Sequence, residues 1–382
     1  MKIVHICLSC FYIDNYSYQE NELVAQNVKD GHDVVVVAST ETFGVDRRLA
    51  YVNPGEYMGS DGVRVMRIPY SKFLPEKIMR KLRIHPGLYK ILEKENPDVI
   101  MFHGLCGWEL LTAARYKSKH SAVILYADSH EDLNNSARGF ISKYILHYIY
   151  YRSILKMALR RIEKILCISQ DVIVFVRDFY GVPSDRIEFY PLGGEVLSDE
   201  CYGEIRRNTR NHYGIKDEQV LFVQSGKIDK IKKLIESLQE FKKIEGDRYR
   251  FLISGSLQED VRQDVLKLVS EDQRVSFIGW KSPKELQALL CAADVYVQPG
   301  SQSATMQMSI CCRCAVILDD VLSHQPFVNG NGWLVGKNMS LDEAFLEASS
   351  CSREKLSDMD NKSADIAESV LDYKLLAKRI YQ

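Results

Sequence analysis

The sequence predicts an α/β protein made of two successive units, each a parallel sheet covered by helices. Short apolar segments alternate with helix-like segments along the whole chain, which is the pattern of such sheets. The alternation pauses at a polar stretch from Ser198 to Arg210 and then starts again. The length of 382 residues suits two domains of ordinary size, each with its own core.

The first unit opens with the strand-like segment KIVHICL, the helix-like segment ENELVAQNVKDGH and the strand-like segment DVVVVAS. Gly31 stands where that helix should end, because glycine readily adopts the left-handed backbone found at helix ends. Further strands are expected at VRVMRIP near residue 65, 97–104, 121–129, 164–169 and 186–193. The first unit is therefore a series of strand–helix–strand repeats.

The second unit repeats this pattern after residue 210. Its expected strands are VLFVQSG, YRFLISG, VSFIGW, DVYVQPG and AVILDD, separated by helix-like segments such as KKLIESLQEFKKI and PKELQALLCAA. In open sheets of this kind, ligands bind outside the carboxyl ends of the strands. We therefore expect the functional loops to follow the strands, with the substrate in a cleft between the two domains.

Composition excludes several classes of protein. A formal net charge of -1 argues against a protein that binds nucleic acid along an extended surface. The ten cysteines show no framework of paired spacings, and no signal segment is expected at the N-terminus, so the sequence predicts a reducing cytoplasm and no metal site. Apolar runs are shorter than the roughly 18 to 20 residues that a membrane-spanning helix needs.

The segment VLFVQSGKIDKIKK at 220–233 carries the main chemical motif. An apolar strand breaks at Ser225-Gly226, and four lysines surround the helix start that follows: Lys227, Lys230, Lys232 and Lys233. Glycine lets the backbone approach a ligand, helix-start amides point at anions, and ammonium groups neutralise a leaving phosphate. The motif predicts a diphosphate site, and the alternative is a solvated charge run that opens an amphipathic helix.

Five local motifs follow one another in a recognisable order. They are Gly31-His32-Asp33-Val34 before VVVAS; Ile168-Ser169 followed by Tyr180-Gly181-Val182-Pro183 and Pro191-Leu192-Gly193; Gly226-Lys227-Ile228 with Lys232; Phe277-Ile278-Gly279; and Asp294-Val295-Tyr296-Val297 with Pro299. Together they resemble the retaining glycosyltransferases of family 4, which have the GT-B fold, over nearly the whole chain.

The resemblance implies two Rossmann-like domains that face each other across a cleft. The expected domains are an acceptor-side domain at 1–197 and a nucleotide-sugar-binding domain at 205–365, with a C-terminal helix at about 366–382 packing back on the first. The implied activity is that of a retaining hexosyltransferase, which moves a sugar from a UDP- or GDP-linked donor to a hydroxyl of a glycan or lipid-linked acceptor. The implied role is surface polysaccharide or lipid-linked oligosaccharide biosynthesis, and the implied chemistry needs no metal or other cofactor.

The sequence departs from the family pattern after the expected strand DVYVQP. Most members carry two glutamates there, separated by seven residues, which hold the donor sugar and the ribose. Here the segment reads PGSQSATMQMSICCRCAVI, with no glutamate and about three residues fewer. This departure favours an alternative function, a non-catalytic GT-B subunit that binds and supports a partner glycosyltransferase.

The resemblance also implies site residues in both domains. His130 is expected nearest the reacting sugar, where an imidazole can donate to a hydroxyl or phosphate, and Lys227 and Lys232 are expected to neutralise the leaving diphosphate. The expected donor contacts are Gly226, Gly300, Ser303 and Gln307. The expected contacts on the acceptor or phosphate side are Tyr18, Gln19, Asn21, His103 and Asp132, with Glu131 as the alternative base to Asp132.

Each of these residues also has a purely structural interpretation. His130 is then bonded to a loop backbone, and His103 only ends a buried strand. Ser17 or Asn21 caps the helix that follows, and Ser303 with Gln307 caps the helix that contains MSICC. The sequence alone leaves both interpretations open.

Two stretches of the first unit are strongly basic. Residues 138–164 combine Arg138, Lys143, Arg152, Lys156, Arg160, Arg161 and Lys164 with several tyrosines, and 72–90 is basic as well. Such faces can rest on anionic lipid headgroups, so we expect a cytoplasmic, peripheral membrane protein at the inner face of the membrane. The alternative is a long helix that packs an aromatic stripe on the sheet and keeps its basic side in water.

Overall fold

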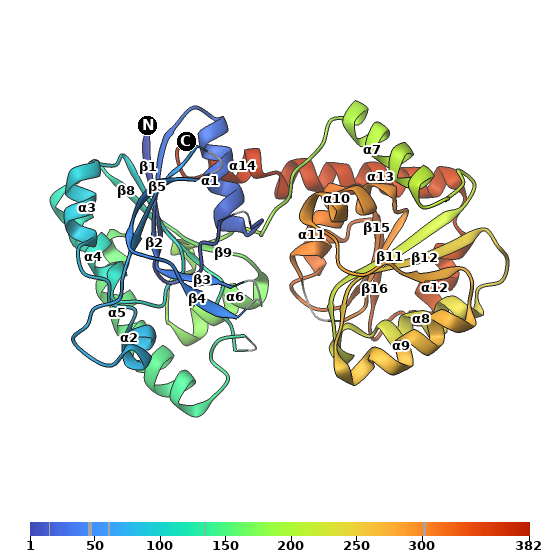
Figure 1. Cartoon of the computed structure of the whole chain (residues 1–382), viewed down its shortest axis with the longest axis horizontal. Helices are drawn as coiled ribbons and strands as arrows, with labels where there is room; N and C mark the ends of the chain where they lie inside the picture. Colours follow the sequence, from blue (N-terminus) through green and yellow to red (C-terminus); the bar gives the residue numbers. More distant parts are fainter. Residues whose placement is uncertain (15, 45–47, 60–61, 134, 301–302) are drawn as a thin grey trace. The chain divides into compact units, whose positions relative to one another are not determined.

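The computed structural model of the chain describes residues 1–14, 16–44, 48–59, 62–133, 135–300 and 303–382. These residues form two compact α/β units (Figure 1). The first unit comprises Met1–Pro191 together with Leu376–Gln382, and the second unit is Leu192–Leu375. The predicted fold class of two Rossmann-like domains is confirmed by the topology of each unit.

The main sheet of the first unit has eight strands. They are β1 (Lys2–Cys7), β2 (Asp33–Ser39), β5 (Gly55–Met58), β6 (Arg64–Ile68), β7 (Val99–Phe102), β8 (Ile124–Ser129), β9 (Ile165–Cys167) and β10 (Ile187–Phe189). Their spatial order is β10-β9-β8-β7-β1-β2-β6-β5, and every pair is parallel except β5 with β6. A separate antiparallel pair is formed by β3 (Glu41–Phe43) and β4 (Leu49–Tyr51).

Helices lie on both faces of this sheet. They are α1 (Gln19–Lys29), α2 (Glu76–Leu82), α3 (Leu88–Glu95), α4 (Glu109–Lys119), the π-helix η1 (Ile141–Tyr151), α5 (Arg152–Ala158), α6 (Gln170–Val174), the π-helical turn η3 (Phe175–Phe179), and the 3₁₀ turns η2 (Leu159–Arg161) and η4 (Ser184–Arg186). One core cluster packs α3, α4, α5 and α6 against the sheet, and a second packs α1 against the other face. The expected helix end is confirmed, because Gly31 follows α1 with φ of +84°.

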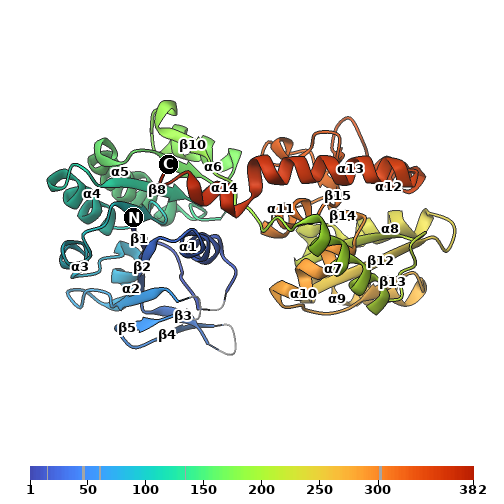
Figure 2. The same ribbon diagram turned by 90° about the horizontal axis from the view of Figure 1, so that it is seen from above.

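The last seven residues of the chain, Leu376–Gln382, belong to the first unit. They include the end of helix α14 (Tyr373–Lys378), and Figure 2 shows this helix ending beside the elements of the first unit. Tyr190 Oη donates a hydrogen bond of 2.9 Å to the carbonyl oxygen of Leu376, and Tyr381 Oη donates one of 2.5 Å to Asp30 Oδ2. The C-terminus is therefore anchored by side chains that lie far from it in the sequence.

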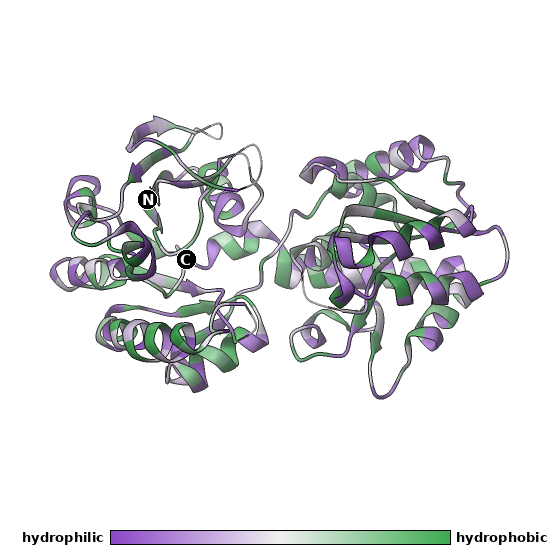
Figure 3. Cartoon of the chain, turned by 60° about the horizontal axis from the view of Figure 1, so that its bottom comes forward, coloured by the Kyte–Doolittle hydropathy of each residue, from purple (hydrophilic) through white to green (hydrophobic). Residues whose placement is uncertain are grey.

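The second unit is a six-stranded, fully parallel sheet. Its strands are β11 (Val220–Ile228), β12 (Tyr249–Leu257), β13 (Val275–Phe277), β14 (Val295–Gln298), β15 (Ala315–Asp319) and β16 (Gly332–Val335). The spatial order is β13-β12-β11-β14-β15-β16, which is the doubly wound order of dinucleotide-binding domains. The longer strands each contain a buried apolar run, such as 220–223 in β11 and 251–253 in β12, and Figure 3 shows helices of this unit that alternate green and purple.

The helices of the second unit cover both faces of its sheet. They are α7 (Asp199–His212), the 3₁₀ turn η5 (Lys230–Lys232), α8 (Leu234–Lys243), α9 (Glu259–Glu271), α10 (Pro283–Ala292), α11 (Ala304–Cys311), the 3₁₀ turn η6 (Gln325–Phe327), α12 (Leu341–Ser350), α13 (Arg353–Ile366) and the π-helical turn η7 (Ala367–Leu371). Apolar residues of α8, α9, α12 and α13 share one core cluster with the strands.

The polar stretch between the two predicted units is a helix. Its residues form α7, which begins where the Ser198 hydroxyl accepts a hydrogen bond from the Cys201 amide. Helical periodicity was hidden there because α7 buries polar groups: Arg206 and Arg210 reach carbonyl oxygens at the end of α10. The pause seen in the sequence is therefore an α-helix of the second unit, in which Arg210 is buried and Arg206 is half-buried.

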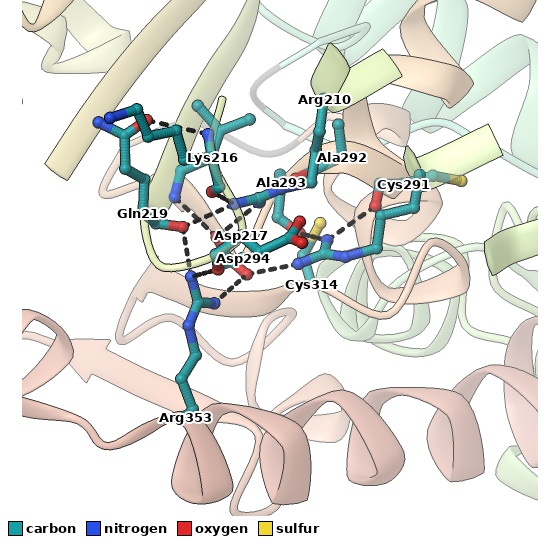
Figure 4. A network of polar contacts seen from close by, with 12 residues as sticks. Arg210, Lys216, Asp217, Gln219, Cys291, Ala292, Ala293, Asp294, Cys314 and Arg353 are labelled. Atoms are coloured by element: carbon teal, nitrogen blue, oxygen red, sulfur yellow. Dashed lines mark hydrogen bonds and ion pairs between the residues drawn. The ribbon is translucent and has the colours of Figure 1, made fainter. Parts of the chain in front are cut away.

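A buried carboxylate organises this part of the second unit (Figure 4). Asp294, which precedes β14, lies 2.6 Å from Arg206 and 3.1 Å from both Arg210 and Arg353, and its Oδ2 accepts a 2.7 Å hydrogen bond from the Leu221 amide. Burial alone would raise the pKa of Asp294, but the arginines and the amide hold it below its usual value. One carboxylate thus joins α7, β11 and α13.

Candidate active site

Each sheet has one place where the strand order reverses. In the first unit this place lies between β1 and β7, and in the second unit between β11 and β14. Loops that leave the carboxyl ends of such a strand pair diverge to opposite faces and leave a crevice for a ligand. Both positions carry the polar residues that the sequence predicted as functional.

A pocket of about 860 Å³ opens at the reversal point of the first unit. Its walls come from the loops after β1, β7 and β8, the start of α1, helix α2 and the π-helix η1. The lining residues with polar or reactive side chains include Tyr18, Glu20, Lys77, Arg80, Lys81, Arg83, Cys106, His130, Glu131, Asn135 and His147. The pocket is built wholly by the first unit.

His130 lies in the wall of this pocket directly after β8. Its side chain is 30% exposed, and its Nε2 lies 3.7 Å from Asp128 Oδ1 and 3.9 Å from Glu20 Oε1. Burial lowers the pKa of His130, but the Asp128 carboxylate outweighs this effect and the net pKa is about 9. The imidazole is therefore protonated at neutral pH, and it forms part of the pocket lining.

Glu131 stabilises the same loop through hydrogen bonds. Its carboxylate accepts hydrogen bonds from the Ser129 hydroxyl at 2.7 Å, from the His130 amide at 3.2 Å and from the Leu105 amide at 3.3 Å. Asp132 is bonded to its own loop instead, since its Oδ1 accepts a 2.7 Å hydrogen bond from the Asn135 amide. Of the two predicted bases, Glu131 lines the pocket.

One wall of the pocket is basic. Helix α2 contributes Lys77, Arg80 and Lys81, of which the two lysines are exposed. Arg80 pairs with Glu41 at 3.0 Å, and Arg83 donates a hydrogen bond to the Ser9 carbonyl in the loop after β1. The residues of this wall fall within the basic stretch seen in the sequence, but their place beside His130 was not predicted.

The predicted acceptor-side residues occupy different places. Tyr18 lines the pocket and is the N-cap residue of α1, without a side-chain cap, so neither Ser17 nor Asn21 has that role. Gln19 Nε2 donates 2.7 Å to the Pro191 carbonyl and Asn21 Nδ2 donates 3.0 Å to the Ile13 carbonyl, and both side chains are buried. His103 is fully buried beneath the pocket. These three side chains are held by protein atoms rather than lining the pocket.

In the second unit, β11 runs through Gly226 and Lys227 before the chain turns into η5. Lys227 is exposed, whereas the Lys232 side chain is only 8% exposed. Burial lowers the pKa of Lys232 and the Asp229 carboxylate partly restores it. Asp229 Oδ1 also accepts the amides of Ile231 at 3.1 Å and Lys232 at 3.3 Å. The amides expected to face a diphosphate here are thus engaged by Asp229.

The loop after β14 approaches η5 very closely. A Cβ atom on Gly300 would lie 1.9 Å from the Ile231 carbonyl oxygen, so only glycine fits. Ser303 is the N-cap residue of α11, yet its Oγ donates 2.5 Å to Gln298 Oε1 instead of capping the helix. Gln307 Oε1 accepts a 2.9 Å hydrogen bond from the Gly193 amide and is buried. Ser301 and Gln302 of this segment lie outside the described residues.

Two buried glutamines of the second unit were not singled out from the sequence. Gln224 in β11 donates 2.8 Å to the Lys232 carbonyl, and Gln298 in β14 accepts from Ser303 and from the Tyr296 hydroxyl. Each glutamine directly follows the apolar residues of its strand, in VLFVQ and VYVQ. A polar residue at that place was the sequence signal that could have identified them. They bring β11, η5 and the start of α11 into one polar cluster.

Within the described part of the chain, no three His, Cys, Asp or Glu side chains are grouped so as to hold a metal ion. Across the same residues, no helix combines the length and the apolar character needed to cross a bilayer.

Models of known protein families match both units. The model described as Glycosyltransferase Family 4 matches residues 21–193, and the model described as Glycosyl transferases group 1 matches residues 205–363. No curated protein matches the sequence.

Solved structures with this fold align over the full length. HepE from Anabaena in complex with UDP aligns with a TM-score of 0.64 and 12% identity over 100% of this chain and 98% of that one. Sucrose-phosphate synthase from Thermosynechococcus elongatus aligns with 0.64 and 12% over 99% and 96%. WaaG, a glycosyltransferase involved in lipopolysaccharide biosynthesis, aligns with 0.62 and 14% over 99% of each chain. At such identities the likeness establishes the fold.

Proposed function

The chain belongs to the family 4 type of GT-B glycosyltransferases, and we propose that it is an active retaining hexosyltransferase with a nucleotide-sugar donor. The proposal is supported by one observation: each of the two points of strand reversal carries a cationic side chain. Protonated His130 lies at the first, and the buried Lys232 lies at the second. HepE has been solved with UDP and with UDP-glucose, which supports a donor of this class here.

The second unit takes the nucleotide part of the donor in this proposal. Lys227 and Lys232 neutralise the negative charge that builds up on the leaving diphosphate as the bond to the sugar breaks. Lys232 contributes more, because its ammonium group is buried and its field is less screened by water. A metal ion is not needed for this charge compensation. Ser303 and Gln298 offer neutral hydrogen-bonding groups in place of the family's glutamates.

The first unit takes the reacting sugar and the acceptor. His130 donates a hydrogen bond to a sugar hydroxyl or a phosphate oxygen, and Glu131 is the nearby carboxylate that accepts a proton from the acceptor hydroxyl. The basic wall of Lys77, Lys81 and Arg83 suits an acceptor that carries phosphate. A lipid-linked oligosaccharide precursor has that chemistry, and WaaG acts in lipopolysaccharide biosynthesis.

We further propose that the mouth of this pocket rests on the inner face of an anionic membrane. Phe73 before α2 is 86% exposed and Phe140 before η1 is 74% exposed. The other exposed apolar residues of these two segments are Leu74, Ile78, Ile141, Tyr144, Ile145, Tyr148 and Ile149. Both segments also line the pocket, so a membrane at this face would deliver a lipid-linked acceptor directly.

Only some of the basic residues in these stretches are suited to contact lipid headgroups in this proposal. Arg152 donates 3.1 Å to the Tyr180 carbonyl and lies 4.5 Å from the centre of the Tyr148 ring, so it has a structural role. Arg160 and Arg161 form part of η2, which precedes β9 and so lies at the amino edge of the sheet, opposite the pocket. Lys72 and Arg138 flank the exposed phenylalanines.

Charge reversal at Lys72 and Arg138 is expected to weaken binding to phosphatidylglycerol-containing vesicles by about tenfold or more, because each basic residue near an anionic surface contributes about 1 kcal/mol. The control is the double reversal of Arg160 and Arg161, which changes the net charge equally at the opposite edge and should change binding by less than about twofold. Co-sedimentation measures both, and an equal loss in the two variants would contradict this membrane face.

Thermal unfolding in the presence of nucleotides tests the proposed activity. A nucleotide diphosphate present at a hundred times its Kd should stabilise the protein by about 2.7 kcal/mol. We expect UDP or GDP to raise Tm and one sugar nucleotide from a donor panel to be hydrolysed slowly without acceptor.

A second candidate function, a non-catalytic subunit for a partner glycosyltransferase, is favoured by the absence of any glutamate from α11. Indifference to every nucleotide would support that subunit role.

A further inference from the structure

A line of buried polar side chains crosses the first unit beneath the pocket. His5 in β1, His103 after β7 and Asp128 in β8 come from three neighbouring strands, and all three are fully buried. His5 Nε2 lies 2.9 Å from Asn27 Oδ1, His5 Nδ1 lies 2.9 Å from His103 Nε2, and His103 Nδ1 lies 2.5 Å from Asp128 Oδ2. Buried polar groups are costly unless they are paired, so this line has a definite hydrogen-bonding order.

The hydrogen-bond acceptors at the two ends of this line determine which ring nitrogens of His5 and His103 carry protons. Asn27 presents an oxygen, so His5 Nε2 carries the proton of that hydrogen bond, and a neutral His5 then accepts at Nδ1. His103 must therefore donate from Nε2 to His5, and it also donates from Nδ1 to the Asp128 carboxylate. Both ring nitrogens of His103 carry protons, which makes His103 a buried imidazolium.

The electrostatics agree with this proton assignment. Burial lowers the pKa of His5 to about 3, so it stays neutral. Burial also acts to lower the pKa of His103, but Asp128 raises it to about 10 overall. The charged and titratable groups that face His103 are His5 and Cys7 from β1, Asp128 from β8 and Glu20 from α1.

Asp128 connects this line to the pocket. One carboxylate oxygen accepts from His103, and the other accepts a 2.6 Å hydrogen bond from the Gly104 amide while facing His130 Nε2 at 3.7 Å. His103 itself does not reach the pocket, because its side chain is fully buried. Any influence of His103 on substrate must therefore pass through Asp128.

We propose that His103 is a positioning residue, whose buried imidazolium, fixed by His5 and Asn27, holds the Asp128 carboxylate toward His130. This proposal rests on the role given above to His130. It replaces the expectation that His103 contacts the acceptor or a phosphate. The functional unit of the first domain is then a four-residue relay, His5–His103–Asp128–His130, rather than one histidine.

Nitrogen NMR of the full chain labelled in its histidines tests the proton assignment without any activity. At pH 8 a histidine with the ordinary pKa of about 6.5 is neutral, whereas His103 should still show two protonated ring nitrogens. Loss of one signal set in a His103→Gln variant assigns the resonances. A single protonated nitrogen on His103 would mean that Asn27 donates to His5 instead, and would overturn the proposal.

The pH dependence of kcat tests the positioning role. His103→Gln keeps a donor for Asp128 but removes the cation, so the pKa of Asp128 should rise and the acid limb of kcat should move up by about one to three pH units. At the optimum we expect kcat to fall by about tenfold or more, with the donor KM changed by less than about twofold.

The matched control is His85→Gln. His85 is also fully buried in the first unit, bonded through Nδ1 to the Pro69 carbonyl at 3.2 Å, and it does not line the pocket with His130. Its substitution should lower Tm comparably without moving the acid limb. If both variants leave the limb in place, His103 is only structural and the positioning role is refuted. If the wild-type protein transfers no sugar, the proposed function fails. The NMR measurement still shows whether His103 carries protons on both ring nitrogens, so it tests the relay separately.

Discussion

Replacement of Lys232 by alanine is expected to lower kcat for sugar transfer by about a hundredfold or more, because in the proposed reaction this buried charge stabilises the leaving diphosphate. The Lys232 side chain is 8% exposed, and its ammonium group acts where water screens little. The effect should appear in kcat more than in the donor KM, since the charge on the leaving group is largest in the transition state.

Steady-state donor consumption with and without acceptor measures this loss. Lys227→Ala should lower kcat less, because Lys227 is exposed. A suitable control is Lys243→Ala in α8, whose ammonium pairs with Glu240 at 2.6 Å on the surface of the same unit. If Lys232→Ala and Lys243→Ala transfer sugar equally fast, the diphosphate does not bind at η5.

Asp294→Asn is expected to destabilise the second unit by about 3–5 kcal/mol, because it removes the buried countercharge of the buried Arg210 and the half-buried Arg206 guanidinium groups. In a unit of this size that change corresponds to a fall in Tm of about 10 °C. Urea unfolding followed by tryptophan fluorescence measures it, since Trp333 in β16 is buried in the core of this unit.

The same carboxylate makes the stability of the second unit depend on pH. The pKa of Asp294 is lowered in the folded state, so its contribution is complete above the unfolded pKa of about 3.9 and is lost as the pH falls through the folded pKa. Asp358→Asn is the control: Asp358 is exposed on α13 and pairs with Lys362 at 3.0 Å, so water screens this ion pair and its loss should leave Tm almost unchanged. Equal Tm values for the two variants would show that the Asp294 cluster is not a stability centre.

The strands were predictable because the main strands of both sheets are continuous apolar runs. β1, β2, β11, β12 and β15 lie where KIVHICL, DVVVVAS, VLFVQSG, YRFLISG and AVILDD were expected. The short edge strand β5 and the last strand β16 were not predicted, because GEYM and GWLV are too short and too mixed to stand out. Helix α7 was missed because its inward face is arginine rather than leucine.

The candidate site was predictable only in part. His130 and Tyr18 line the pocket, and Gly300 makes the close approach to η5, at the strand ends where such residues were expected. Gln19, Asn21 and Gln307 were named for the same reason, yet their amides satisfy backbone groups of the protein. Spacing in the sequence locates a loop, but it does not tell which side chains of the loop turn inward.

By itself, the sequence determined the α/β class, the family and the motifs at the strand ends, because all of these depend on residues that lie close together along the chain. The tertiary structure alone decided the strand order, and with it the two reversal points at which those motifs gather. It also determined which nitrogens carry protons in the proposed relay, because His5 and His103 are 98 residues apart and come into contact only when β1 pairs with β7. A hydrogen bond in the interior takes its direction from both partners, so the chemistry of His103 is a property of the folded sheet.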